Sequence, residues 1–417
     1  MINYFKKIDD FFEKNYKVII SVIIALQVLI MLSMFLFFGY KEAIDSQSYY
    51  LPAIDFIKNG TMRDSTGPTL IRTPGYILFL ALIYLLTNYS NYAVIFIQAL
   101  MCFTMTYLIY YLVSNISKKK SLACLASFFY ICDIAVYTNA LSILTDTLFP
   151  FLLILSLFFL YKYINNKKYL YIFLSFLCLN YALAVRPQIL YLNIILNFVL
   201  LALFIIKKID FKVFLTFLLM FITIFGGWSY RNYKQFGKFD YVPLRSRDYF
   251  LYYAPYTYQQ VNGCSFEEAN TYFEQILNNQ CPKYNELTTM DQIDVMSKIG
   301  KEYVTSNFKE FIICNFKGLF IEMVGPNTDT IEMFNLPNIV KKLIKYFAAG
   351  MLLLSYCIYA FYFLKSIRSQ KWLNWAILLT VMYLMASTAI VGYSRYRLAF
   401  YPLCLIGTFT SYKEKRD

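Results

Sequence analysis

The sequence has no histidine and little charge: Asp, Glu, Lys and Arg make up only 15% of its 417 residues. Without imidazole, histidine general bases and His-ligated zinc are excluded, so acid–base chemistry must fall mainly to carboxylates. The nine cysteines show no C-x-x-C spacing and lie mostly within apolar runs, as small hydrophobic residues do. Only Cys264 and Cys281 share a polar loop, and the sequence leaves a disulfide between them open.

Long uncharged runs dominate the chain, and 59% of its residues are hydrophobic. The first run, from Val18 to Gly39, has 22 residues, and about 20 are enough to cross a bilayer. No A-x-A-like cleavage site follows it, so we expect it to stay in the mature protein. Nine further runs occupy residues 92–113, 121–139, 141–160, 169–185, 187–206, 211–228, 343–364, 372–392 and 396–411. The sequence therefore predicts an all-α polytopic membrane protein with about ten transmembrane helices.

A shorter apolar run, from Gly75 to Asn88, has only 14 residues. At 1.5 Å rise per residue it reaches about 21 Å, which is less than the roughly 30 Å hydrocarbon core. We interpret it as an in-plane or re-entrant helix in the first outer loop. If it crossed the bilayer instead, the bundle would have up to about twelve spans.

Basic residues are concentrated in six segments that this topology places on one side of the membrane: 1–17, 118–120, 161–168, 207–212, 365–371 and 411–417. They hold 19 Lys or Arg against 6 acidic residues, in a chain of net charge +14. Such an excess marks the cytoplasmic side. Both termini are therefore predicted to be cytoplasmic, and these basic residues orient the chain without requiring a nucleic acid partner.

Carboxylates and arginines gather at the opposite, outer face, where apolar runs end. Asp45 follows the first run, Asp146 lies in a tight turn between two runs, and Arg186 ends another. Four further arginines belong to the same face: Arg72, Arg231, Arg395 and Arg397. We divide the chain into a transmembrane module at 1–230, which includes the first outer loop at 40–90, an outer region at 231–342 and C-terminal helices at 343–417.

The outer region has the pattern of a small, mainly helical subdomain. Ser265 and Glu268 have the spacing of a capping box, and apolar residues recur after them at helical intervals. A second helix is predicted over about 290–304. Neither helix suggests a catalytic fold of its own, so we interpret this region as a lid on the membrane module.

Six stretches, in order, resemble landmarks of GT-C glycosyltransferases: DSQSYYLPAIDFIKNG, RTPGYILFLALIYLL, LTDTLFPFLLILSLFFLY, AVRPQILYL, GGWSYRNYKQFGKF and GYSRYRLAFYPL. The sequence is most similar to bacterial relatives of protein O-mannosyltransferases (glycosyltransferase family 39) and to lipid A aminoarabinose transferases. The resemblance implies transfer of a sugar from a polyprenyl-phosphate carrier to an acceptor on the outer face. It also implies a catalytic acid in the first outer loop, and that position is Asp45 here.

The chain departs from the family pattern at two positions. The second loop of the family often has a Thr-Glu pair, where this chain has Thr145 and Asp146, which keeps the charge on a shorter side chain. The first loop often begins with two adjacent acids, whereas Ser46 follows Asp45 here. A divalent cation such as Mg²⁺ or Mn²⁺ is therefore left open as a cofactor.

These residue types suit such a transfer. The leaving phosphate is already anionic, so the reaction needs one base that takes the acceptor hydroxyl's proton on the opposite face, as in an inverting glycosidase. The phosphate needs fixed positive charge, which Arg supplies as a bidentate fork. We predict Asp45 and Asp146 as catalytic residues, with Asp45 as the base. Residues predicted to bind substrate are Tyr49, Arg72, Arg186, Arg231, Arg395 and Arg397.

Other interpretations stay open at this stage. Asp146 is also suited to the N-terminal turn of a helix, and Arg186 and Arg231 are also suited to snorkelling at the membrane surface. A transporter or flippase for lipid-linked sugars and a non-catalytic membrane protein are the alternative functions. The donor sugar, the carrier length and the acceptor, which is a glycan, a lipid or a protein, are not readable from the sequence.

The topology makes a prediction that labelling can test. A cysteine introduced at Ser117 should not react with a membrane-impermeant maleimide in intact cells, because that end of its helix is cytoplasmic. A cysteine at Asn279, in the outer region, should react and serves as the matched control. Strong labelling at position 117 from outside would rule out this topology.

Overall fold

The computed structural model describes residues 2–65, 67–70, 72–325, 331, 337–366 and 372–410. In these ranges the chain is almost entirely helical. One short hairpin interrupts the helices, formed by β1 (Arg63–Asp64) and β2 (Gly67–Pro68), which pair antiparallel. The tail at 411–417 and residues 367–371, which contribute to the predicted cytoplasmic charge, lie outside the described residues. The prediction of an all-α polytopic membrane protein is confirmed.

Six of the described helices are long and apolar enough to cross a membrane. They are α1 (Ile2–Phe38), α4 (Asn91–Ser117), α7 (Thr145–Asn166), α9 (Leu190–Ile205) with the preceding 3₁₀ turn η1 (Pro187–Ile189), α10 (Phe211–Phe236) and α16 (Asn338–Ser366). A seventh span is formed if the bent pair α5 (Lys120–Ile131) and α6 (Ile134–Ala140) counts as one. These long helices fall on seven of the ten predicted runs.

Of the three remaining runs, the one at 169–185 forms α8 (Tyr169–Val185) with the predicted bounds. The other two form shorter helices than the sequence predicts, α17 (Trp372–Ala386) and α18 (Tyr401–Thr410). Residues 387–400, which the sequence assigned largely to two spans, instead form turns and the 3₁₀ helix η6 (Ser394–Ala399). The difference matters for function because this irregular segment carries Arg395 and Arg397.

The run at 121–139 is not one straight helix, as the apolar pattern suggested, because it bends by 57° between α5 and α6. Asp133 lies at the break, where its carboxylate accepts a hydrogen bond from the backbone N–H of Ala135, at 3.0 Å, and caps α6. The cap satisfies an N–H group that would otherwise be unpaired in an apolar bundle.

The first outer loop carries two helices, α2 (Gln47–Asn59) and α3 (Pro74–Thr87). α2 ends at Gly60, which has a φ of 69°, a left-handed conformation that glycine adopts without strain. α3 begins with Pro74 at its first turn, and Gly75 lies so close to the backbone of Ala184 that a Cβ would be 2.5 Å from its carbonyl carbon. The hydroxyl of Thr73 donates to the carbonyl of Val185 at 3.1 Å. The start of α3 is therefore fixed against the end of α8.

The outer region forms a lobe of four helices: α11 (Ala254–Asn262), α12 (Phe266–Gln280), α13 (Thr289–Ser306) and α14 (Phe308–Val324). The predicted capping box at Ser265 and Glu268 is present, and the helix expected over 290–304 is α13. Phe250, Phe273 and Ile299 belong to a small core of this lobe. Cys264 and Cys281 are free thiols, so the disulfide that the sequence left open is not formed.

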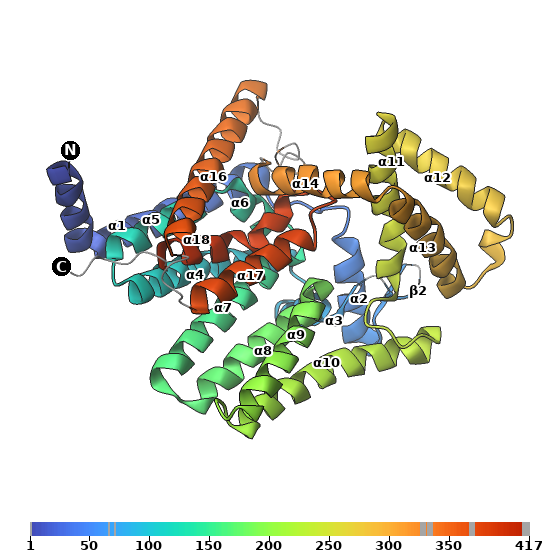
Figure 1. Cartoon of the computed structure of the whole chain (residues 1–417), viewed down its shortest axis with the longest axis horizontal. Helices are drawn as coiled ribbons and strands as arrows, with labels where there is room; N and C mark the ends of the chain where they lie inside the picture. The colour runs from blue at the N-terminus through green and yellow to red at the C-terminus, as the bar shows by residue number, and fades with distance from the viewer. Residues whose placement is uncertain are drawn as a thin grey trace.

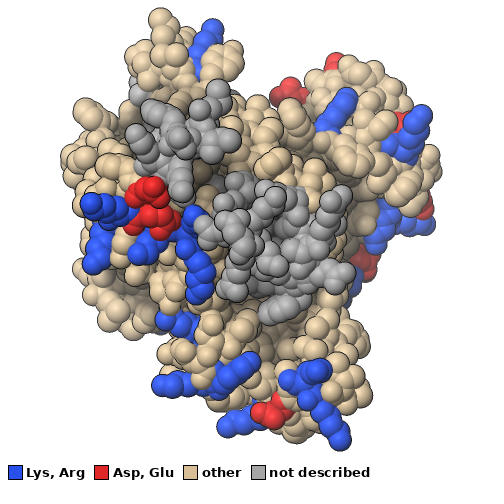
Figure 2. Space-filling model, turned by 60° about the vertical axis from the view of Figure 1, so that its left-hand side comes forward, with Lys and Arg blue, Asp and Glu red and all other residues tan. Residues whose placement is uncertain are grey.

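The lobe and the first turns of α1 lie at opposite ends of the molecule. Figure 1 shows α11, α12 and α13 at the right and the start of α1 at the left. Figure 2 turns the left-hand side of that view toward the viewer and shows Lys and Arg side chains at several places on that surface, with fewer acidic ones. The side of the membrane on which each end lies stays a prediction.

A close helix crossing beside the irregular segment makes a stability prediction. Gly318 on α14 lies against the carbonyl oxygen of Ala389, which a Cβ at position 318 would overlap. We expect Gly318→Ala to lower stability by roughly 1–3 kcal/mol, the usual cost of overpacking, measured as thermal stability in detergent. Gly227→Ala on α10, where a Cβ meets nothing within 4 Å, is the control and should be neutral or stabilising. Equal stability of both variants would contradict this packing.

Candidate active site

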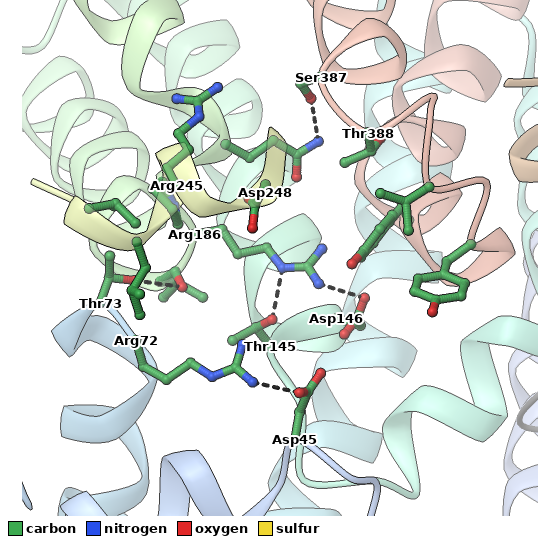
Figure 3. Close-up of a pocket in the computed structure, with 18 of the residues that line it drawn as sticks. Asp45, Arg72, Thr73, Thr145, Asp146, Arg186, Arg245, Asp248, Ser387 and Thr388 are labelled. Atoms are coloured by element: carbon green, nitrogen blue, oxygen red, sulfur yellow. Dashed lines mark hydrogen bonds and ion pairs between the residues drawn. The ribbon is translucent and has the colours of Figure 1, made fainter. Parts of the chain in front are cut away.

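A cavity of about 440 Å³ opens where the first outer loop, the ends of several apolar helices and the segment before the outer lobe meet. It is lined by the start of α7, the end of α8, residues 242–253 and part of residues 387–396. Six of the eight residues predicted to form the site line it: Asp45, Tyr49, Arg72, Asp146, Arg186 and Arg395. Figure 3 shows the side chains of Asp45, Arg72, Asp146 and Arg186 converging on this space from different parts of the chain.

Asp45 is bound by two arginines. Arg72 Nη2 donates to Asp45 Oδ1 at 2.6 Å, and Arg395 Nη2 donates to Asp45 Oδ2 at 3.3 Å. Arg72 is itself held by the hydroxyl of Ser48 at 2.7 Å and by the ring of Tyr49, whose centroid is 4.5 Å from the guanidinium carbon. Burial disfavours the charged form of Asp45, but the two arginines outweigh it and lower the pKa of the carboxyl below its ordinary value. Asp45 is therefore an ionised counter-ion in this state.

Asp146 forms a second, more deeply buried pair. Arg186 Nη2 donates to Asp146 Oδ1 at 2.9 Å, and Arg186 Nε donates to the hydroxyl of Thr145 at 2.8 Å. The side chain of Asp146 is only 1% exposed. It lies in the first turn of α7, where the helix dipole favours a negative charge, but its side chain binds Arg186 rather than the helix N–H groups.

A third charged group, Arg245, Arg247 and Asp248, also lines the cavity, and sequence reasoning missed it. It lies at the junction of the 3₁₀ helix η2 (Pro243–Arg247) and the π-helical turn η3 (Tyr249–Tyr253). The signal for it was the run RSRD directly after an aromatic and proline-containing stretch. The interpretation of the outer region as a lid gave this run no predicted role in the site.

The two arginines of this third group differ from the other three arginines of the cavity, which are each paired with a carboxylate. Within the described residues, neither Arg245 nor Arg247 forms an ion pair, and Arg247 Nε is buried without a hydrogen-bond partner. Arg245 lies over the ring of Tyr191, 5.0 Å from its centroid. Because Arg72, Arg186 and Arg395 are already paired, these are the guanidinium groups most available to an anion in the cavity.

Arg231 and Arg397, which the sequence placed among the substrate-binding residues, do not line the cavity. Arg231 Nη1 donates to the carbonyl of Thr69 at 2.6 Å, and its guanidinium lies over the ring of Trp228. Arg397 is fully buried and forms a bidentate pair with Asp133, with distances of 2.6 and 2.8 Å, and it also donates to the carbonyl of Gly325. These contacts hold loops and helices in position. Because neither residue lines the cavity, its geometry does not support the predicted substrate contacts of Arg231 and Arg397.

The residues around Asp45 do not fit a divalent cation. Both carboxylate oxygens accept hydrogen bonds from guanidinium groups. The described part of the chain also holds no group of three or more His, Cys, Asp or Glu residues placed to bind a metal. Asp45 therefore does not offer a site for Mg²⁺ or Mn²⁺.

The pair of Arg397 and Asp133 makes a prediction that separates structure from substrate binding. Arg397→Gln should destabilise the protein by about 3–5 kcal/mol, because it leaves a buried carboxylate unpaired. Adding Asp133→Asn should recover part of that loss, measured as thermal stability in detergent. A stable Arg397→Gln protein that no longer binds undecaprenyl phosphate would instead support the contact predicted from sequence.

Comparison with known proteins gives little at the level of sequence. No protein family model matches the chain, and no curated protein matches it. Among solved structures, the chain is similar to the archaeal oligosaccharyltransferase AglB from Archaeoglobus fulgidus, solved in complex with an inhibitory peptide and a dolichol-phosphate. The match has 12% sequence identity and a TM-score of 0.47, and it covers 96% of this chain and 50% of AglB. The chain thus spans about half the length of that protein.

Proposed function

We propose that this protein is a membrane glycosyltransferase that moves a sugar from a polyprenyl-phosphate carrier to an acceptor hydroxyl on the outer face of the membrane, with inversion. One observation carries the proposal: a cavity at the ends of apolar helices is lined by five arginines and three aspartates, and two of the arginines have no carboxylate partner among the residues that the structure describes. A lipid-borne phosphate would meet this excess of positive charge while its prenyl tail stays in the bilayer. The sequence resemblance to GT-C enzymes supports the same function.

The arginines would have two roles: some would bind the phosphate, and others would stabilise the charge that develops on it. Arg245 and Arg247 are suited to hold the phosphate, because binding it would not require them to leave another anion. Arg72, Arg186 and Arg395 would add positive charge to the cavity while they stay paired with Asp45 and Asp146. As the bond from the sugar to the phosphate breaks, the leaving group gains negative charge, and these fixed charges would stabilise it.

The location of the cavity favours transfer over transport. Asp146 belongs to the first turn of α7, Arg186 caps the end of α8, and Thr73 precedes α3. Transporters of this kind usually place their sites near the bilayer midplane, at broken helices. A site at helix ends is open to an acceptor from water as well as to a donor from the lipid.

The function is tested directly by donor consumption. Purified protein in lipid nanodiscs should release prenyl phosphate from at least one member of a panel of prenyl-phosphate-linked hexoses and pentoses, with added alcohols or water as acceptor. The double variant Arg72→Gln/Arg395→Gln, which loses the cations around Asp45, should release much less. Folded wild-type protein that releases no prenyl phosphate from any donor would contradict the proposed function.

The phosphate role of the unpaired arginines is tested by binding. Arg245→Gln/Arg247→Gln should weaken the binding of farnesyl phosphate by roughly 10- to 100-fold, as expected for lost hydrogen bonds to a charged group. Binding of farnesol, which has the same tail without the phosphate, should change little. Lys283→Gln, which removes an exposed cation of the outer lobe, is the control. Unchanged farnesyl phosphate affinity in the double variant would rule out this anion site.

A further inference from the structure

Sugar transfer to a hydroxyl needs a base whose oxygen is free to take a proton. Neither aspartate predicted from the sequence meets this need in the structure. Both oxygens of Asp45 are bound by guanidinium groups, and Asp146 is buried against Arg186. For Asp45, the contacts that lower its pKa also oppose its protonation. The side chain of Asp146 is only 1% exposed, which leaves little access for a substrate hydroxyl.

Asp248 is the third carboxylate of the cavity, and it is placed differently. Figure 3 shows its carboxylate pointing toward Arg186, whereas the guanidinium of Arg245 points the opposite way from the same segment, so a hydroxyl at Asp248 and a phosphate at Arg245 lie on opposite sides of a sugar between them. Its carboxylate forms no hydrogen bond or ion pair with any residue in the described part of the chain. Its oxygens are therefore free for a substrate hydroxyl.

The segment that carries Asp248 is held in place from three sides. The side-chain amide of Asn232 donates to the carbonyl of Asp240 at 2.8 Å, and the hydroxyl of Tyr241 donates to the carbonyl of Leu183 at 3.0 Å. On the side of the lobe, Gly300 of α13 packs against the backbone of Tyr249, where a Cβ would overlap the carbonyl carbon. Asp248 also lies next to a π-helical turn, and such turns are frequent at functional sites. The position of the carboxylate is thus built into the fold.

The surroundings of Asp248 also suit a base. Burial raises the pKa of its carboxyl to about 6, although Arg247 and Arg245 act in the opposite direction. Other charged or titratable groups face this region from neighbouring elements: Arg186 at the end of α8, Arg395 of η6, Lys301 of α13, and Tyr252 and Tyr253 of η3. A base is most effective when its pKa lies near the working pH. Above about pH 6 this carboxyl is ionised and able to accept a proton.

We propose that Asp248, rather than Asp45, is the catalytic base of the transfer, an assignment that rests on the proposed function. The acceptor hydroxyl gives its proton to a carboxylate oxygen of Asp248 while its oxygen forms a bond to the anomeric carbon of the sugar. The bond from that carbon to the phosphate oxygen breaks, and the electron pair leaves with the lipid phosphate. Asp248 then releases the proton to water. Asp45 and Asp146 act as positioning residues that hold the arginines.

The experiment compares three Asp→Asn variants in nanodiscs, with a prenyl-phosphate-linked sugar that the wild type consumes. Asp248→Asn should reduce prenyl phosphate release by roughly 10²- to 10⁴-fold, while undecaprenyl phosphate binds within a few-fold of wild type. Asp45→Asn should change the binding of undecaprenyl phosphate and KM more than kcat, because it removes the carboxylate that holds Arg72 and Arg395 in position. Asp294→Asn, which removes an exposed carboxylate paired with Lys238, is the control and should behave as wild type.

A pH profile separates a base from a merely structural residue. In the wild type, kcat/KM should rise with pH and level off with a midpoint near pH 6, and this limb should be absent from the residual activity of Asp248→Asn. Infrared difference spectra should show a carboxyl that titrates in the same range and is lost in Asp248→Asn, a readout that needs no substrate.

The outcomes distinguish the two proposals. If the wild type consumes donors but Asp248→Asn does so within a few-fold of it and keeps the acidic limb, the assignment of Asp248 is overturned and the proposed function stands. Loss of turnover in Asp45→Asn with normal undecaprenyl phosphate binding would return the role to Asp45. If the wild type consumes no donor, both proposals fall.

Discussion

A charge at the end of an apolar helix bundle must either meet a partner or face an aqueous cavity, because an isolated charge in hydrocarbon is costly. The arrangement of this molecule follows from that constraint. Asp133 and Arg397 are fully buried and satisfy each other. Asp45 and Asp146 are paired with arginines at the wall of the cavity. Arg245, Arg247 and Asp248 form no ion pair in the described part of the chain, and they face the cavity.

Paired and unpaired charges therefore have different roles: the paired groups hold the structure in place, and the groups without ion pairs are available to a substrate. The buried pair joins the break between α5 and α6 to the segment before α18, so it holds together parts of the chain that are far apart in sequence. The pairs in the cavity wall fix guanidinium groups in position before a substrate arrives, and such preorganisation is a main source of electrostatic catalysis. The groups without ion pairs are those that a substrate can engage at least cost. The proposed roles of the arginines and of Asp248 follow this order.

Local patterns in the sequence predicted local structure well. The capping box at Ser265, the end of α2 at Gly60 and the apolar helices all depend on residues a few positions apart. The convergence of Asp45, Arg72, Asp146 and Arg186 could be anticipated because each lies at a helix end on one predicted face. The partner of Asp133 could not, since Arg397 is 264 positions away and no periodicity encodes it. Asp248 was missed for a similar reason: only the packing of residues 240–253 between α8, α10 and α13 turns an ordinary charged loop toward the cavity.

The central claim is that the cavity binds a lipid-borne phosphate. The most direct measurement is an experimental structure of the protein in lipid nanodiscs with undecaprenyl phosphate. The account predicts the phosphate inside the cavity, within hydrogen-bond distance of Arg245 or Arg247, with the prenyl chain running into the bilayer. A phosphate bound elsewhere, for example among the basic residues near the chain termini, with the cavity arginines still facing water, would contradict it.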